Sequence, residues 1–230
     1  MEKKRAVKIR LGLTLSAAII AIMLIASVYA WVQLPADVSI PIHWGISGEA
    51  DGFAGKDIAL FIVPVVSLFV AGLLALVPIL EPRKLNLEKS GKPYLICWIG
   101  SLILELVAHM CIVLSALSVD VPVMQVISVA LGLLFAVIGN YMGKVRSNYH
   151  FGVRTPWTLE SEYSWNKTHR LAGWLFVLTG LGTVLSSFSN NGALIVAVML
   201  GGTTVTAIGS ITYSYFCWKN DPSKGVEKSS

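Results

Sequence analysis

Six long runs of mostly apolar residues divide this chain and limit what it can fold into. They cover residues 11–32, 58–80, 94–117, 121–142, 171–188 and 193–218. A run of about 18 apolar residues or more is a candidate transmembrane helix. Only 13% of the residues are charged, against about 25% in soluble domains. The sequence therefore predicts an all-α integral membrane protein with six transmembrane helices, forming a single membrane domain over residues 1–230.

The distribution of lysine and arginine predicts the orientation of these helices. With the N-terminus inside, 17 of the 18 basic residues fall in the N-terminal segment, the inner loops and the C-terminal tail, and only Lys56 lies outside. Membrane proteins keep their basic residues in cytoplasmic loops. We therefore expect both termini in the cytoplasm, an extracellular loop 33–56 and a cytoplasmic loop 144–170. The charge of +5 then indicates contact with membrane lipid and no direct binding of nucleic acid.

The inner loop 144–170 is the richest polar segment. Thr155 followed by Pro156 is typical of a helix start. If that helix continues, Trp157, Ser161, Trp165 and Thr168 or His169 share one face. Arg154 and Arg170 would pair with Glu160, Glu162 or lipid phosphate. The segment is either an interfacial linker helix or a docking site for a cytoplasmic partner or ligand, with the candidate residues Arg154, Thr155, Pro156, Trp157, Trp165, Thr168, His169 and Arg170.

The outer loop 33–56 contains a short stretch, SIPIHW, with the composition of an extended segment, followed by glycine-rich turns. Its acidic turn residues and its aromatic residue suit contact with a peptide or a lipid headgroup. An ordered external loop without a ligand is the alternative. The candidate residues are His43, Trp44, Gly48, Glu49 and Asp51.

Glu105 and His109 lie inside the third apolar run, four residues apart and so on one helix face. A charge in hydrocarbon is costly, which favours a face turned into the bundle with the two side chains bonded to each other. Such a pair is either a structural clamp or a proton-linked polar site. Gly139 and Gly143 form a G-x-x-x-G motif that suits packing between helices.

The sequence contains no pattern for a metal, a cofactor or a catalytic centre. Its three cysteines, Cys97, Cys111 and Cys217, lie apart in apolar runs without zinc spacing. Ser161 and His169 are two helical turns apart, too far for a nucleophile and its base. We expect no enzymatic activity.

Two motifs resemble a known family. IPIHWGISGEADGF resembles the short N-terminal module of unknown function that often precedes SdpI-type proteins. GNYMGKVRSNYHFGVRTPWTLESEYSWNKTHRLAGWLF strongly resembles the core motif of the SdpI immunity-protein family, with Gly143 where the family often has proline. The resemblance divides the chain into a two-helix module with its outer loop at 11–80 and a four-helix region at 81–230, with the core motif at 139–176.

The resemblance implies a multi-pass protein of the bacterial plasma membrane. The namesake of the family protects a cell from a secreted antimicrobial peptide, and is implicated in holding a cytoplasmic transcriptional repressor away from DNA. By this resemblance, a toxin peptide outside and a repressor inside are the expected partners. A small proton-coupled exporter of peptides or drugs, using Glu105, is the alternative.

Overall fold

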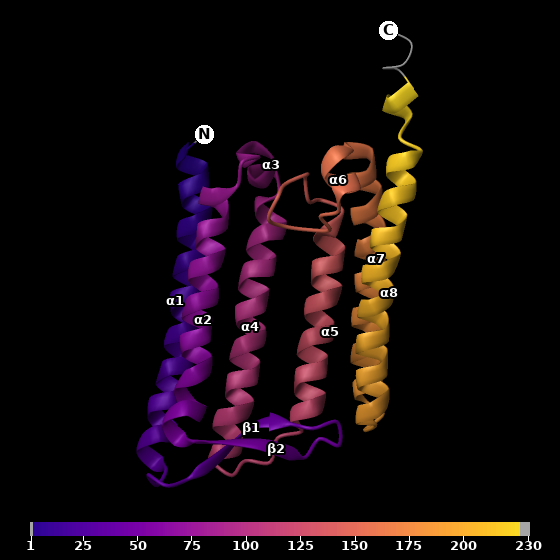
Figure 1. Ribbon diagram of the computed structural model, residues 1–230. Coiled ribbons are helices and arrows are strands. Elements are labelled where there is room, and N and C mark those ends of the chain that lie inside the picture. Colours follow the sequence, from indigo (N-terminus) through magenta and orange to yellow (C-terminus); the bar gives the residue numbers. More distant parts are fainter. Residues whose placement is uncertain (1, 226–230) are drawn as a thin grey trace.

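A computed structural model describes the backbone of residues 2–225 and the side chains of residues 9–223 (Figure 1). Six helices in this part of the chain are long and apolar enough to cross a membrane, which confirms the prediction of six spans. Most N-terminal basic side chains and Lys228 lie outside the described residues, so the orientation stays a prediction. The six helices are α1 (Glu2–Gln33), α2 (Lys56–Leu80), α4 (Gly91–Ala116), α5 (Val123–Met142), α7 (Glu162–Ser187) and α8 (Gly192–Lys219).

The helices form two groups that meet along a seam between α4 and α5. One group contains α1, α2 and α4, and the other contains α5, α7 and α8 (Figure 1). Glycines let α5 and α7 approach closely, because a Cβ on Gly139 would lie 2.5 Å from the Gly173 carbonyl oxygen and one on Gly180 would lie 2.4 Å from that of Gly132. Gly139 therefore packs within the chain, while a Cβ on Gly143 would meet nothing within 4 Å.

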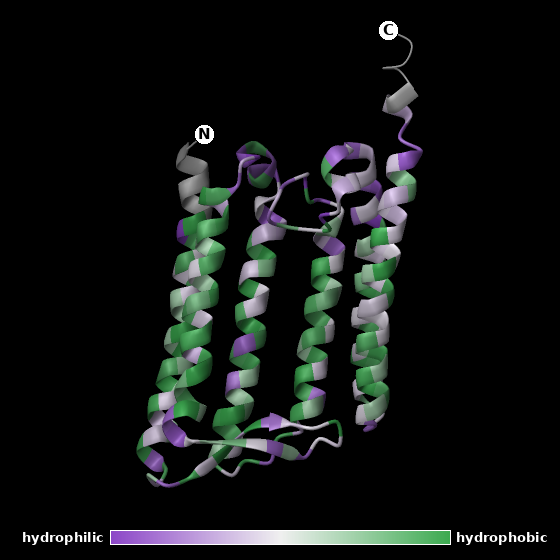
Figure 2. Ribbon diagram, viewed as in Figure 1, coloured by the Kyte–Doolittle hydropathy of each residue, from purple (hydrophilic) through white to green (hydrophobic). Residues whose placement is uncertain are grey.

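The outer loop corrects the all-α prediction, because it forms an antiparallel hairpin of β1 (Ser39–Trp44) and β2 (Ala50–Gly55). The backbone N–H of Gly45 donates to the Glu49 carbonyl at 2.9 Å. Gly48 has φ +86°, a conformation that glycine adopts without strain. The hairpin lies across the outer ends of α4 and α5 (Figure 1). Between the hairpin and the polar inner loops, the helices consist mostly of apolar residues (Figure 2).

Short helices shape the inner side: α3 (Lys84–Lys89), α6 (Pro156–Glu160) and a 3-10 turn at Pro222–Gly225. Thr155 caps α6 with Pro156 in its first turn, as predicted. The expected continuous helix face is wrong, because Ser161 has an extended backbone, ends α6 and caps α7 through its side chain. The fifth membrane helix therefore begins at Glu162 rather than at Leu171.

Candidate functional site

A buried carboxylate, Glu81, organises the inner loop. It lies at the end of α2, fully buried, and accepts hydrogen bonds from His150 Nδ1 at 2.7 Å, from the Arg83 N–H at 2.8 Å and from the Tyr149 N–H at 3.1 Å. Burial alone would raise its pKa, but the bonds from His150 and the two backbone N–H groups outweigh burial and hold the pKa of Glu81 below its usual value. Glu81 is not among the residues predicted from the sequence, although a carboxylate directly after an apolar run indicates a need for buried partners.

Side chains around α3 fasten the same loop from the other side. The Arg83 guanidinium bonds to Ser147, donates to the Leu159 carbonyl at 3.2 Å and lies 4.6 Å from the centre of the Tyr149 ring. Asn86 Nδ2 donates to the Ser147 carbonyl at 2.8 Å. Because α3 joins α2 to α4 of the first group and the loop follows α5 of the second, these bonds connect the two groups at this end of the helices.

Asn148 folds the loop upon itself. Its side chain is fully buried and uses both ends of its amide. Nδ2 donates to the carbonyls of Arg146 at 2.8 Å and Phe151 at 2.9 Å, and Oδ1 accepts from the N–H groups of His150 at 3.0 Å and Phe151 at 2.7 Å. Phe151 then packs edge-on against Tyr94 of α4, with ring centres 5.8 Å apart. The loop is therefore ordered by its own hydrogen bonds and by packing against α4.

The second half of the loop is folded around His169. Its Nδ1 donates to the Trp165 carbonyl at 2.8 Å and its Nε2 accepts from the Val153 N–H at 3.0 Å, so both ring nitrogens are used by backbone groups. The Trp165 ring stacks on it at 4.1 Å and donates to the Val145 carbonyl at 2.8 Å. Gly152 has φ +109°, and a Cβ there would lie 2.4 Å from His169 Nε2.

The structure divides the predicted inner residues into buried and accessible ones. Thr155, Trp165, Thr168 and His169 are buried, and Thr155 bonds to Ser214 of α8 at 2.9 Å. Trp157 is half-buried and packs on Tyr215 with ring centres 5.3 Å apart. Three candidates remain exposed on the inner face: Arg154, Pro156 and Arg170.

The ion pairs predicted for this loop are not formed. Arg154 donates to the Tyr149 carbonyl at 2.8 Å instead. Within residues 9–223, no ion pair joins Arg154 or Arg170 to Glu160 or Glu162. Both arginine side chains are exposed at the surface of this loop.

The outer hairpin brings the predicted outer residues together. His43 and Asp51 face each other across the strands, with Nδ1 and Oδ1 2.5 Å apart, and both side chains are more than half exposed. Gly48 and Glu49 form the exposed turn, and Trp44 is half-buried at the end of β1. The residues predicted from the outer loop therefore lie together on one small hairpin.

The hairpin covers a cavity at the outer end of the α4–α5 seam. Ile40 is fully buried against the ends of α1, α2 and α4, and the Ile46 carbonyl lies so close to α8 that a Cβ on Gly192 would be 1.8 Å from its oxygen. The cavity beneath β1 has a volume of about 240 Å³ and is lined by Ile42, His43, Trp44, Ala108, Cys111, Ile112, Val123, Met124 and Ile127. It presents apolar side chains beside the polar His43–Asp51 pair.

Glu105 and His109 face α1 and α2, but they do not bond to each other as expected. Ser67 of α2 donates to the Glu105 carboxylate. His109 Nε2 lies 3.0 Å from Ser27 Oγ and 3.2 Å from the Met23 carbonyl oxygen, both on α1. Serine hydroxyls on the two neighbouring helices offer each side chain its own partner, which removes the need for a direct pair. Glu105 therefore connects α4 to α2, and His109 connects α4 to α1.

Comparison with known proteins places these sites in a family. The SdpI/YfhL protein family matches residues 144–214, and a domain of unknown function, DUF1648, matches residues 18–68. The Immunity protein SdpI of Bacillus subtilis (strain 168) is 26% identical over 208 residues, which cover 89% of this chain and 95% of that protein. No solved structure matches the chain. The SdpI/YfhL match contains the inner loop and the DUF1648 match contains the outer hairpin. The chain belongs to the SdpI/YfhL family, with a DUF1648 domain towards its N-terminus.

Proposed function

We propose that this protein is an immunity protein of the bacterial plasma membrane that protects its cell from a secreted antimicrobial peptide. The observation that carries the proposal is the similarity to the Immunity protein SdpI along nearly the whole length of both chains. Six apolar helices and an ordered hairpin at the face opposite the basic loops support it. With the predicted orientation, that hairpin faces the space from which the peptide arrives.

The cavity beneath β1 is the proposed peptide site. An apolar side chain of the peptide enters between β1, α4 and α5, and a polar or charged group contacts His43 and Asp51. The volume of about 240 Å³ suits one or two side chains rather than a complete small molecule. The exposed strands of a two-stranded hairpin also offer backbone groups for an added peptide strand.

A second part of the proposal concerns the inner face. A cytoplasmic repressor would contact the exposed Arg154, Pro156 and Arg170, because the other predicted residues lie within the folded loop. To test this, a reporter gene under the repressor is measured with Arg170→Ala and with Lys219→Ala, a second exposed basic residue of the same face. Reporter expression should fall with Arg170→Ala alone, because repressor that the membrane protein no longer holds binds its DNA. Equal reporter expression with both variants would remove this part of the proposal.

Export is the alternative, and the placement of Glu105 within α4 is the observation that favours it. Glu105→Gln keeps the shape of the side chain and its contact with Ser67, but the glutamine cannot take up or release a proton. In an exporter this substitution abolishes protection together with its dependence on the proton gradient. A binding immunity protein keeps its protection.

Survival of cells tests the proposed function. A sensitive strain expressing the chain is challenged with the secreted peptide against which the family namesake protects. Ile127→Trp fills the cavity beneath β1, whereas Leu185→Trp adds the same ring on an exposed position of α7. We expect survival with the wild type and Leu185→Trp, and death with Ile127→Trp at equal membrane levels. Death of wild-type cells would contradict the proposed function for this peptide.

A further inference from the structure

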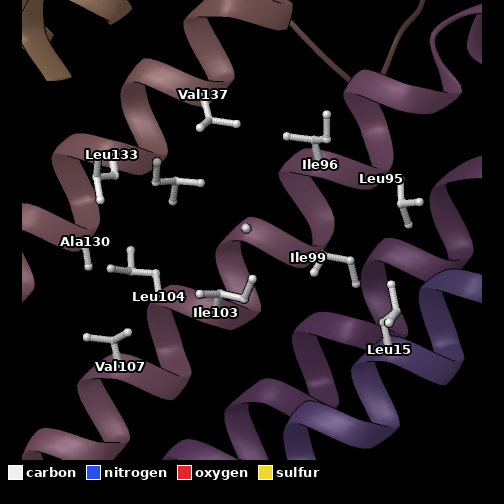
Figure 3. Close-up of a pocket in the computed structure, with 12 residues that line it drawn as sticks. Leu15, Leu95, Ile96, Ile99, Ile103, Leu104, Val107, Ala130, Leu133 and Val137 are labelled. Atoms are coloured by element: carbon white, nitrogen blue, oxygen red, sulfur yellow. The ribbon is translucent and has the colours of Figure 1, made fainter. Parts of the chain in front are cut away.

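The inner part of the α4–α5 seam holds an apolar groove that the proposed peptide site does not use. Its volume is about 560 Å³, and side chains of α4 and α5 face each other across it, with Leu15 of α1 at its edge (Figure 3). Every lining residue is apolar. Ile103, Leu133 and Val137 are about half exposed, so the groove opens towards the surrounding lipid.

The length of the groove matches one leaflet of the bilayer. It extends along α4 from Leu95 to Val107, and these two residues are separated by twelve helical steps of about 1.5 Å, or about 18 Å. The hydrocarbon core is about 30 Å thick, or about 15 Å per leaflet. Beyond Val107 the same seam is covered by β1, with Ala108 and Ile127 already part of the outer cavity. A membrane-spanning helix therefore lacks a continuous groove, while an acyl chain has one of suitable length.

Two lysines, Lys92 and Lys144, lie at the inner end of the groove beside Tyr141. Lys92 lies one helical turn before Ile96 on α4, and Tyr141 lies one turn after Val137 on α5. The Lys92 Nζ is 5.5 Å from the centre of the Tyr141 ring, and the Nζ of Lys144 is 4.6 Å from it. Both lysines are exposed. Basic residues between helices at the membrane surface are the feature that holds phospholipid headgroups of negative charge.

We infer that the α4–α5 groove binds one anionic phospholipid, with an acyl chain along the groove and its phosphate between Lys92 and Lys144. The Tyr141 ring holds the two lysines at headgroup depth and separates the charge from the apolar groove. The apolar lining, the length of the groove and the positive charge at its end favour a lipid over a membrane-spanning helix. This lipid fills the groove between the two helix groups.

The test compares lipids on the purified full chain in detergent. Phosphatidylglycerol or phosphatidylcholine is added, and bound lipid is counted by native mass spectrometry together with the thermal unfolding midpoint. Lys92→Gln/Lys144→Gln removes the headgroup site, and Lys84→Gln/Lys89→Gln removes equal charge from exposed positions of the same face. Leu133→Trp blocks the groove, and Leu181→Trp is its match on α7, with similar exposure.

The expected result is preferential binding of phosphatidylglycerol, about tenfold weaker in Lys92→Gln/Lys144→Gln because each lysine near an anionic group contributes severalfold. Leu133→Trp should lower the binding of both lipids, while the two control variants behave as wild type. Equal wild-type affinity for the two lipids would overturn the inference. So would unchanged phosphatidylglycerol binding in Leu133→Trp, or a dimer of the chain that this variant abolishes, which would assign the groove to a second copy.

Discussion

Replacement of Glu81 by glutamine isolates the contribution of the buried carboxylate to the inner loop. The substitution preserves the size of the side chain and removes its charge. In the structure the carboxylate serves three donors, the His150 ring and the N–H groups of Arg83 and Tyr149. The glutamine amide has one acceptor oxygen, and its NH₂ group must face at least one of these donors.

The loss follows from those contacts. One hydrogen bond to a charged group contributes about 1.5–3 kcal/mol, and a buried donor left without a partner costs about 1–3 kcal/mol. We therefore expect Glu81→Gln to lower the free energy of unfolding by about 3 kcal/mol, within the range for breaking a buried pair. His150→Ala should cost less, because the His150 side chain is 32% exposed and the two backbone donors keep Glu81 as their partner.

The pH dependence gives a second signature of the same residue. Because its folded-state pKa is lowered, the stabilisation by Glu81 is present above the unfolded carboxyl pKa of about 4.3. It is lost as the pH falls through the folded value. The difference between wild type and Glu81→Gln should therefore be full at pH 6 and shrink below about pH 4.

Unfolding in mixed micelles measures this difference, and hydrogen exchange at the Tyr149 amide reports the loop itself. Glu160→Gln, an exposed acid of the same inner region, should remain within about 0.5 kcal/mol of wild type. A loss below about 1 kcal/mol for Glu81→Gln, or an equal loss at pH 3 and pH 6, would refute the assignment of Glu81 as the anchor of the loop.

Three further changes test other parts of the fold. Gly152→Ala should cost about 3 kcal/mol in unfolding and expose the inner loop to protease, because its φ of +109° and the contact with His169 both oppose a Cβ. Gly180→Ala should cost about 1–3 kcal/mol by separating α5 from α7, whereas Gly201→Ala, whose Cβ meets nothing within 4 Å, should not destabilise. His43→Ala should change unfolding by less than about 0.5 kcal/mol, since its side chain is 72% exposed, yet weaken protection against the peptide.

The membrane helices were predictable because lipid imposes a strong rule on composition. A stretch that lacks charge over the thickness of a bilayer has few folds other than a helix, so the six spans follow from hydropathy. The cap at Thr155 was predictable for a local reason, since its hydroxyl bonds to the backbone of the next turn. Such contacts depend on neighbouring residues alone.

Three of the errors came from contacts that join distant parts of the chain. Glu105 and His109 are neighbours on α4, but Ser67 and Ser27 from other helices bond to them separately. The sequence predicts the Trp165 ring on an aromatic helix face, but the ring is buried. Its N–H donates to the Val145 carbonyl at 2.8 Å, a contact that the sequence does not reveal. Two of the three donors to Glu81 belong to Tyr149 and His150, 68 and 69 positions away, and no local pattern identifies them.

Binding of the peptide to the purified protein tests the central claim most directly. The full chain in nanodiscs is titrated with the labelled secreted peptide, and wild type is compared with Ile127→Trp and Leu185→Trp. The account predicts saturable binding by wild type and Leu185→Trp, and at least tenfold weaker binding, about 1.4 kcal/mol, by Ile127→Trp. Equal affinity of all three proteins would show that the cavity beneath β1 is not where the peptide is held.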